Sequence, residues 1–305
     1  MRFGAAFWVQ RTGWPELREA VVAAEEAGFD SVWIDDHLLA DEGEWTTPKL
    51  EGWATLAAVA TVTTRARLGL MVAANTFRNP GLTAKLATTL DHVSGGRAIL
   101  GLGAGWFERE HEAFGIDFGS SVGERLDRLA EAVPLVRRLL DGERVSHDGR
   151  FYRLHDALCE PRPLQAHLPI LIGGSGPRKT LPLIASHADM WNGYGTPDKL
   201  AGIAEVLAAH CAAVGRDPAT IDRSVTQNVV VRDDRASAVR AWDAVKAAHG
   251  PRDDEDHPDL VGNPEQLAEE LRRYSAVGID ESVWVFRAPF DLETMGRLRD
   301  VRALL

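Results

Sequence analysis

The sequence predicts an α/β fold, a (β/α)8 TIM barrel with an inserted hairpin or loop region after the fourth strand. Eight short β-rich runs alternate with longer runs of helical periodicity, the pattern of parallel strands joined by crossover helices. The chain has 305 residues, a usual length for one closed α/β barrel. An open doubly wound sheet is the alternative, but strand number and length together favour the barrel. Because no linker or repeat divides the chain, we expect a single domain over residues 1–305 with an insertion at about 141–167.

Each predicted strand is a short run of aliphatic, β-branched or aromatic residues that ends in a polar or glycine-rich segment. Such runs suit strands that are buried on both faces by helices. In chain order, the strands are expected at 2–9, 31–35, 67–75, 98–100, 168–174, 188–193, 223–231 and 282–286.

The predicted helices show apolar side chains at intervals of three and four residues. Pro15 begins the first helix and Gly28 caps its C-terminus. One face of this helix carries Leu17, Ala20, Val21, Ala24 and Ala27. The other helices are expected at 53–63, 80–93, 122–140, 179–186, 199–214, 237–249, 264–277 and 292–304.

Two segments depart from the alternation of strands and helices. Within 141–167, Asp148 and Gly149 form a dipeptide typical of a tight β-hairpin turn, and the segment then becomes rich in proline. The acidic run RDDEDHPD at 252–259 is interpreted as a solvent-exposed loop. The chain lacks the His and Cys spacing of known zinc motifs, so no metal is expected.

Net charge, cysteine number and the distribution of apolar residues indicate which partners and which cellular compartment to expect. The net charge is −11, which argues against binding to nucleic acid or to an anionic membrane. Only two cysteines occur, so a disulfide framework is not expected and a reducing cytoplasm fits better. The N-terminus lacks the pattern of a signal peptide, and no segment is apolar enough to predict a transmembrane helix.

Barrel enzymes place their chemistry at the C-terminal ends of the strands, so the residues there are the candidate site. Asp36 and His37 directly follow the second predicted strand. A histidine beside a carboxylate can transfer protons, which makes both residues candidate catalytic groups. The alternative is a polar turn in which Asp36 caps a helix.

Two glycine-rich turns are candidate cofactor sites. The segment GGSGPRKT follows the fifth strand and begins a helix, which suits an anion such as a phosphate. It departs from both the Walker A loop and the nucleophile elbow, since Pro177 and Arg178 break those patterns. The candidate phosphate ligands are Gly173, Gly174, Ser175 and Gly176.

The second turn, GLGAGW, misses the dinucleotide pattern because Trp106 occupies the third glycine position. Small residues at the end of the fourth strand would let a flat ligand approach the backbone, and Trp106 would form one wall. The alternative is that these glycines serve packing only. The candidate ring-binding residues are Ala73, Asn75, Gly103, Gly105 and Trp106.

Together these motifs resemble the luciferase-like flavin-dependent oxidoreductases and monooxygenases, and among them the branch that uses coenzyme F420. The resemblance extends nearly end to end. Its most specific part is RARLGLMVAANTFRNPGLTAKLATTLDHVSGGRAILGLGAGW at 65–106, supported by AEEAGFDSVWIDDH at 24–37 and LPILIGGSGPRKTLPLIASHADMWN at 168–192.

The resemblance implies a barrel that binds reduced F420, or alternatively FMN, across its mouth. The ring would lie near the second to fourth strands and the phosphate at 173–176. Asp36 and His37 match the family's acidic-histidine pair, and a non-proline cis peptide is implied within Met71–Ala74. Trp106 stands where sugar-phosphate dehydrogenases of the family carry a glutamate, which counts against that activity. The reactive cysteine of bacterial luciferase has no equivalent, which counts against light emission.

The leading functional hypothesis is an oxidoreductase that uses reduced F420 for hydride transfer to a small organic substrate. An FMNH2-dependent monooxygenase that uses O2 is the alternative, followed by a non-catalytic barrel that binds a small ligand. A separate flavin or F420 reductase would be a partner. A homodimer is also expected, because the helices at 53–63 and 80–93 carry small or apolar residues on more than one face.

Overall fold

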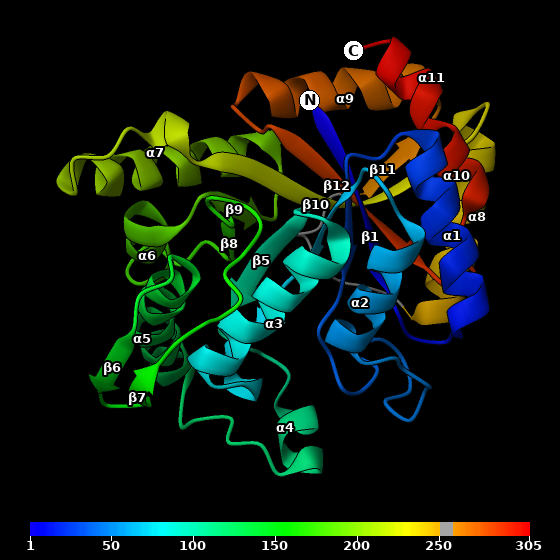
Figure 1. Cartoon of the computed structure of the whole chain (residues 1–305). Coiled ribbons are helices and arrows are strands. Elements are labelled where there is room, and N and C mark those ends of the chain that lie inside the picture. Colours follow the sequence, from blue (N-terminus) through cyan, green and yellow to red (C-terminus); the bar gives the residue numbers. More distant parts are fainter. Residues whose placement is uncertain (251–258) are drawn as a thin grey trace.

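Parallel strands close into a barrel whose order follows the chain, as predicted (Figure 1). The computed structural model describes residues 1–250 and 259–305. The last barrel strand pairs with the first and closes the ring. The barrel strands are β1 (Arg2–Trp8), β2 (Ser31–Ile34), β3 (Arg67–Leu70) with its short continuation β4 (Ala73–Ala74), β5 (Ala98–Gly103), β8 (Ile170–Gly173), β9 (Met190–Gly193), β10 (Asp222–Val231) and β12 (Glu281–Arg287).

Helices connect these strands and cover the outside of the barrel (Figure 1). The first helix shows how particular residues fix where a helix begins and ends. Pro15 lies in its first turn, and Gly28 adopts a φ of 105° at its C-terminus. The helices are α1 (Trp14–Ala27), α2 (Gly52–Val62), α3 (Pro80–Ser94), α4 (Glu108–Phe114), α5 (Val122–Leu140), α6 (Thr180–His187), α7 (Pro197–Ala213), α8 (Arg235–His249), α9 (Pro264–Ala276), α10 (Leu292–Gly296) and α11 (Leu298–Ala303).

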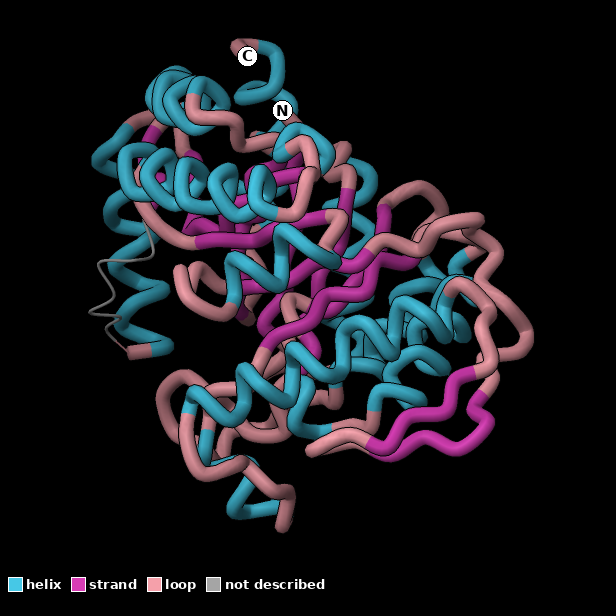
Figure 2. Tube along the Cα trace, turned by 90° about the vertical axis from the view of Figure 1, so that its left-hand side faces the viewer, coloured by secondary structure: helices cyan, strands magenta, loops and turns pink. Residues whose placement is uncertain are grey.

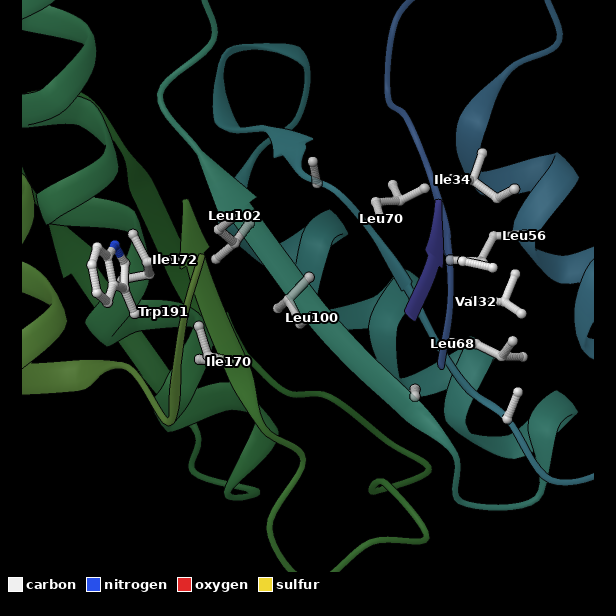
Figure 3. Packing of buried hydrophobic residues seen from close by; sticks show 14 of the residues in the cluster. Val32, Ile34, Leu56, Leu68, Leu70, Leu100, Leu102, Ile170, Ile172 and Trp191 are labelled. Carbon is white, nitrogen blue, oxygen red and sulfur yellow. The ribbon is translucent and has the colours of Figure 1, made fainter. Parts of the chain in front are cut away.

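The core has two layers because alternate strand residues point to opposite faces. One layer lies between strands and helices, and Figure 3 shows part of it, where Leu100 and Leu102 of β5 pair with Ile170 and Ile172 of β8. The other fills the barrel itself and contains Ala6, Trp8, Trp33, Met71, Ile99, Leu171, Met190, Val283 and Val285. Polar residues at the next inward-facing positions, closer to the C-terminal ends of the strands, therefore lie at the mouth of the barrel.

The structure corrects several predicted boundaries. The expected strand at 67–75 is interrupted by a cis peptide bond between Met71 and Val72, which confirms the cis peptide implied by the resemblance. The strand expected at 98–100 continues to Gly103, so Gly101 and Gly103 are strand residues instead of turn residues. The expected helix at 292–304 divides after Gly296 into α10 and α11, consistent with the weak helix propensity of glycine.

The predicted hairpin is present in the inserted region. β6 (Val145–Asp148) and β7 (Arg153–Ala157) pair antiparallel and lie apart from the barrel sheet (Figure 2). Glu131 of α5 accepts hydrogen bonds from the backbone N–H groups of Phe151 and Tyr152, which fixes the hairpin turn against this helix.

One strand was not predicted. β11 (Asp259–Gly262) pairs with the end of β10, and Asp259 accepts hydrogen bonds from Asn228 and Trp242. The rest of the predicted acidic loop at 252–259 lies outside the described residues.

Candidate active site

His37 lies just past β2 and is held by a carboxylate from another part of the chain. Its Nδ1 is 2.9 Å from Oε1 of Glu110, and the other oxygen of Glu110 accepts a 2.7 Å hydrogen bond from the backbone N–H of Leu38. Glu110 is buried in α4. Glu110 therefore fixes both the His37 ring and the chain that follows it.

Three carboxylates raise the pKa of His37. Burial alone would lower the pKa of the imidazole, but the hydrogen bond to Glu110 and the charges of Asp41 and Asp35 outweigh it, so the pKa of His37 is raised above its ordinary value. The charge of His37 in turn lowers the pKa of Asp41, against the opposing effect of burial. The surrounding carboxylates thus favour the protonated form of His37 more than water would.

Asp36 has a different set of contacts. Its carboxylate accepts two hydrogen bonds from Arg78, at 2.6 and 2.9 Å, and one of 2.9 Å from the backbone N–H of Ala74. Burial raises the pKa of this carboxyl group, and Arg78 offsets the effect only in part. Both oxygens therefore bind protein groups that position β4 and the turn after it.

The loop between β2 and α2 contains two buried ion-pair groups that were not predicted from the sequence, one within the loop and one that joins it to the barrel. Lys49 contacts both Asp35 and Asp41. Glu42 pairs with Arg287 at the end of β12, with a closest distance of 2.8 Å, and Arg287 also donates to Asn228 at 2.9 Å. Residues 245 positions apart form the second pair, so only tertiary structure could identify it.

The glycines of β5 are explained by packing against the neighbouring segment. A Cβ at Gly101 would overlap the carbonyl oxygen of Leu70, and a Cβ at Gly103 would lie 2.6 Å from Val72. Gly173 of β8 also faces Val72, at 3.3 Å from the position of its added Cβ. The packing alternative left open by the sequence therefore accounts for Gly103, and its identity alone gives no argument for a flat ligand.

Several predicted site residues meet around Val72 nonetheless. Ala73 and Ala74 pair in register with Leu102 and Gly103. Asn75 is buried and donates a 2.8 Å hydrogen bond to the hydroxyl of Tyr152 in the inserted hairpin. The insertion thus supports the segment that carries Ala73 and Asn75.

Trp106 and Gly105 lie at the rim of the same region. Gly105 has a φ of +81°, and its carbonyl accepts a 3.0 Å hydrogen bond from Arg125. The ring of Trp106 contacts the edge of the His37 ring, with centroids 5.4 Å apart. The structure thus brings the two predicted residues His37 and Trp106 into direct contact.

The turn at 173–176, predicted to bind a phosphate, precedes α6, which begins at Thr180. Gly174 has a φ of +113°, and its carbonyl accepts a 2.8 Å hydrogen bond from the indole of Trp191. Lys179 at the N-cap provides no side-chain cap for α6. Within the first turn of α6, the backbone N–H of Leu181 donates to the carbonyl of Gly176 at 3.0 Å, and Pro182 has no N–H.

The described residues contain no group of three or more His, Cys, Asp or Glu side chains arranged to hold a metal ion. None of the described helices has the length and apolar character required to cross a membrane.

Comparison with known sequences gives one family and several named relatives. A family described as luciferase-like monooxygenase matches residues 1–257. The chain is 33% identical over 268 residues to an F420-dependent hydroxymycolic acid dehydrogenase of Mycobacterium tuberculosis, which covers 86% of this chain and 72% of that protein. It is 38% identical over 184 residues to an F420-dependent glucose-6-phosphate dehydrogenase of Microbacterium testaceum, covering 59% of this chain but only 53% of that protein.

Solved structures share the fold at low sequence identity. An F420-dependent secondary alcohol dehydrogenase in complex with an F420-acetone adduct has a TM-score of 0.82 at 21% identity, covering 99% of this chain and 98% of that one. The long-chain alkane monooxygenase LadA has a TM-score of 0.83 at 15% identity, covering 100% and 91%. These similarities confirm the predicted barrel.

Proposed function

The chain belongs to the luciferase-like monooxygenase family and is an oxidoreductase, and we propose that it transfers hydride from reduced coenzyme F420 to a small organic substrate. The observation that carries the proposal is the pairing of His37 with the buried Glu110, next to Trp106, at the C-terminal ends of the barrel strands. This pairing raises the pKa of His37, and the glycine-rich turn at 173–176 follows β8. The two relatives described above, at 33% and 38% identity, are F420-dependent dehydrogenases by name, which favours F420 over FMN.

The residues present fit an F420-type group. Gly174, Ser175 and Gly176 would form the turn that holds its phosphate, with the backbone N–H groups of Ser175 and Gly176 as donors, because successive backbone N–H groups in such a turn favour an anion. Ala73, Asn75, Gly103, Gly105 and Trp106 would border its ring, since β4 pairs with the end of β5 and Trp106, which follows β5, contacts His37. A separate reductase that regenerates the reduced coenzyme would be its partner.

The mechanism assigns each protein group a task. When bound, the coenzyme supplies the hydride. His37 donates a proton from its imidazolium to the substrate, and Glu110 holds its ring so that one nitrogen remains available. Asp36 positions Arg78 and the backbone at Ala74 without taking part in proton transfer.

A titration of the purified chain with F420 and FMN side by side tests the proposal. We expect binding of F420 and oxidation of its reduced form in the presence of an acceptor without consumption of O2. Preferential binding of FMN together with oxygen consumption would instead support the monooxygenase alternative. Binding of neither coenzyme would overturn the proposed function.

Changing Gly176 tests the phosphate turn. A Cβ at this position would lie 2.9 Å from Oγ1 of Thr180, so any substitution disturbs the turn slightly. Gly176→Ala therefore serves as the steric control for Gly176→Asp. The aspartate should weaken F420 binding at least about tenfold more than the alanine, because it adds a negative charge beside the bound anion. Equal affinities of the two variants, measured by calorimetry, would place the phosphate elsewhere.

We also propose a homodimer that packs through α2 and α3. On α3, Leu82 and Val93 are 52% and 47% exposed, which leaves apolar surface beyond the face that covers the barrel. Light scattering should report twice the mass of one chain. Leu82→Glu should shift the protein to the mass of one chain without loss of helical content. A monomeric wild type at every concentration would show that the alanines of α2 only favour helix formation.

A further inference from the structure

Building on the function proposed above, we propose that Trp106 and Trp45 form the wall that recognises the substrate, and that this substrate is an uncharged planar molecule with a conjugated carbonyl group. The reaction would add a hydride to carbon and the proton of His37 to the carbonyl oxygen. The conjugated system gains two electrons in this step, and reduced F420 is oxidised.

The exposure of the tryptophans is the first argument. The chain contains nine tryptophans, and all of them lie in the described residues. Only Trp45 and Trp106 are exposed, at 41% and 61%. An exposed tryptophan offers a large, rigid apolar face that a ligand can cover. Both rings belong to the segments that hold His37, as the next contacts show.

Trp106 is held in place before any ligand arrives. Its ring stacks on Phe107 at a centroid distance of 5.3 Å and an angle of 28°. It also meets the His37 ring edge-on, at 5.4 Å and 79°. A flat molecule lying on the exposed part of Trp106 would therefore lie beside the imidazole that donates the proton. Rigid aromatic walls favour planar ligands because little side-chain entropy is lost on binding.

Trp45 adds a second ring from the loop between β2 and α2. The guanidinium group of Arg109 lies 4.0 Å from the centroid of this ring. Arg109 immediately precedes Glu110, the residue that holds His37. The contact thus connects Trp45 to the helix that carries the His37 partner.

The charges around the mouth disfavour an anionic substrate. Three largely buried cations, Lys49, Arg78 and Arg287, are already paired with carboxylates. A phosphate group that recruited one of them would leave a buried carboxylate without its partner, which is costly. The buried carboxylates at this end of the barrel include Asp35, Asp36, Asp41, Glu42 and Glu110. An uncharged substrate neither displaces a carboxylate from its cation nor meets the repulsion of these carboxylates.

Binding measurements test the wall without relying on turnover. The planar probe is 2-methyl-1,4-naphthoquinone, and the anionic probe is glucose 6-phosphate. Both are titrated by calorimetry into the chain alone and into the chain saturated with oxidised F420. The variants are Trp106→Ala, Trp106→Phe and Trp45→Ala, with Leu164→Ala as the control because Leu164 is also exposed, at 56%, but lies in the inserted region.

We expect Trp106→Ala to weaken naphthoquinone binding about tenfold, Trp45→Ala to weaken it less, and Trp106→Phe and Leu164→Ala to retain it. F420 affinity should stay unchanged in Trp45→Ala and Leu164→Ala, whereas Trp106→Ala, which also removes a proposed neighbour of the F420 ring, is compared by naphthoquinone binding to the chain alone. Unchanged naphthoquinone affinity of the chain alone in Trp106→Ala, a loss of F420 affinity in Trp45→Ala equal to its loss of naphthoquinone affinity, or tighter binding of glucose 6-phosphate than of naphthoquinone would each overturn the inference. A wild type that fails to bind F420 would refute the proposed function instead, while quinone binding to the chain alone would still decide the role of Trp106.

Discussion

Replacing His37 with asparagine is expected to lower turnover roughly 100-fold or more, the usual scale for loss of an acid-base group. Asparagine can still donate a hydrogen bond to Glu110, so the contact that orders the segment is retained while proton transfer is lost. Turnover is followed by deazaflavin absorbance with an acceptor on which the wild type is active. F420 affinity and melting temperature should change little. Normal turnover combined with a large loss of stability would show that His37 serves the fold.

The pH dependence gives His37 a second, independent readout. Its pKa in the folded chain lies above the ordinary value of about 6.5. Its charge interactions therefore stabilise the fold fully below about pH 6.5 and are lost as the pH rises through the folded pKa. The difference in free energy of unfolding between the wild type and His37→Asn should accordingly decrease from pH 6 to pH 9, because the wild type loses the charge interactions of His37 over this range. Turnover should fall over the same interval, because the proton donor is lost.

Asp36→Asn is expected to lower the free energy of unfolding by about 3 kcal/mol, the low end for breaking a buried ion pair. The low end applies because Arg78 keeps a second partner, Glu51, at 3.0 Å. Urea denaturation measures the change. In the double variant Asp36→Asn/Arg78→Met most of the loss should be recovered, since no buried charge remains unpaired.

Asp117→Asn is the matched control for Asp36→Asn. Asp117 pairs with Arg128 at 2.6 Å, but its side chain is 73% exposed. Its replacement should cost less than about 1 kcal/mol. If Asp36→Asn also costs this little and turnover nevertheless falls strongly, Asp36 would be a catalytic group instead of a positioning residue.

The sequence predicted the barrel because local patterns define its strands and helices. Apolar runs and helical periodicity are local, so the order of the elements could be inferred without tertiary information. The same holds for the cluster of candidates at the mouth, since residues that follow parallel strands must gather at one end. The contact between His37 and Trp106 follows from that rule.

Pairing between distant charges could not be predicted. Glu108, Glu110 and Glu112 look alike in sequence, but only Glu110 is buried, and it meets a histidine 73 positions away. The pair between Glu42 and Arg287 depends on how one loop crosses the barrel mouth. The sequence could not show whether Gly103 serves packing or ligand binding. The structure decides this, because the space beside Gly103 is occupied by Val72.

The packing of Val72 has a consequence for protein engineering. Its side chain fills space left by Gly101, Gly103 and Gly173, which belong to two other strands. These four positions share one volume and form a single unit for redesign. A library that varies Gly103 alone should yield few folded clones, whereas a larger residue there combined with Val72→Ala could be accommodated. Reshaping the floor of the barrel mouth therefore requires simultaneous changes in β5, β8 and the segment between β3 and β4.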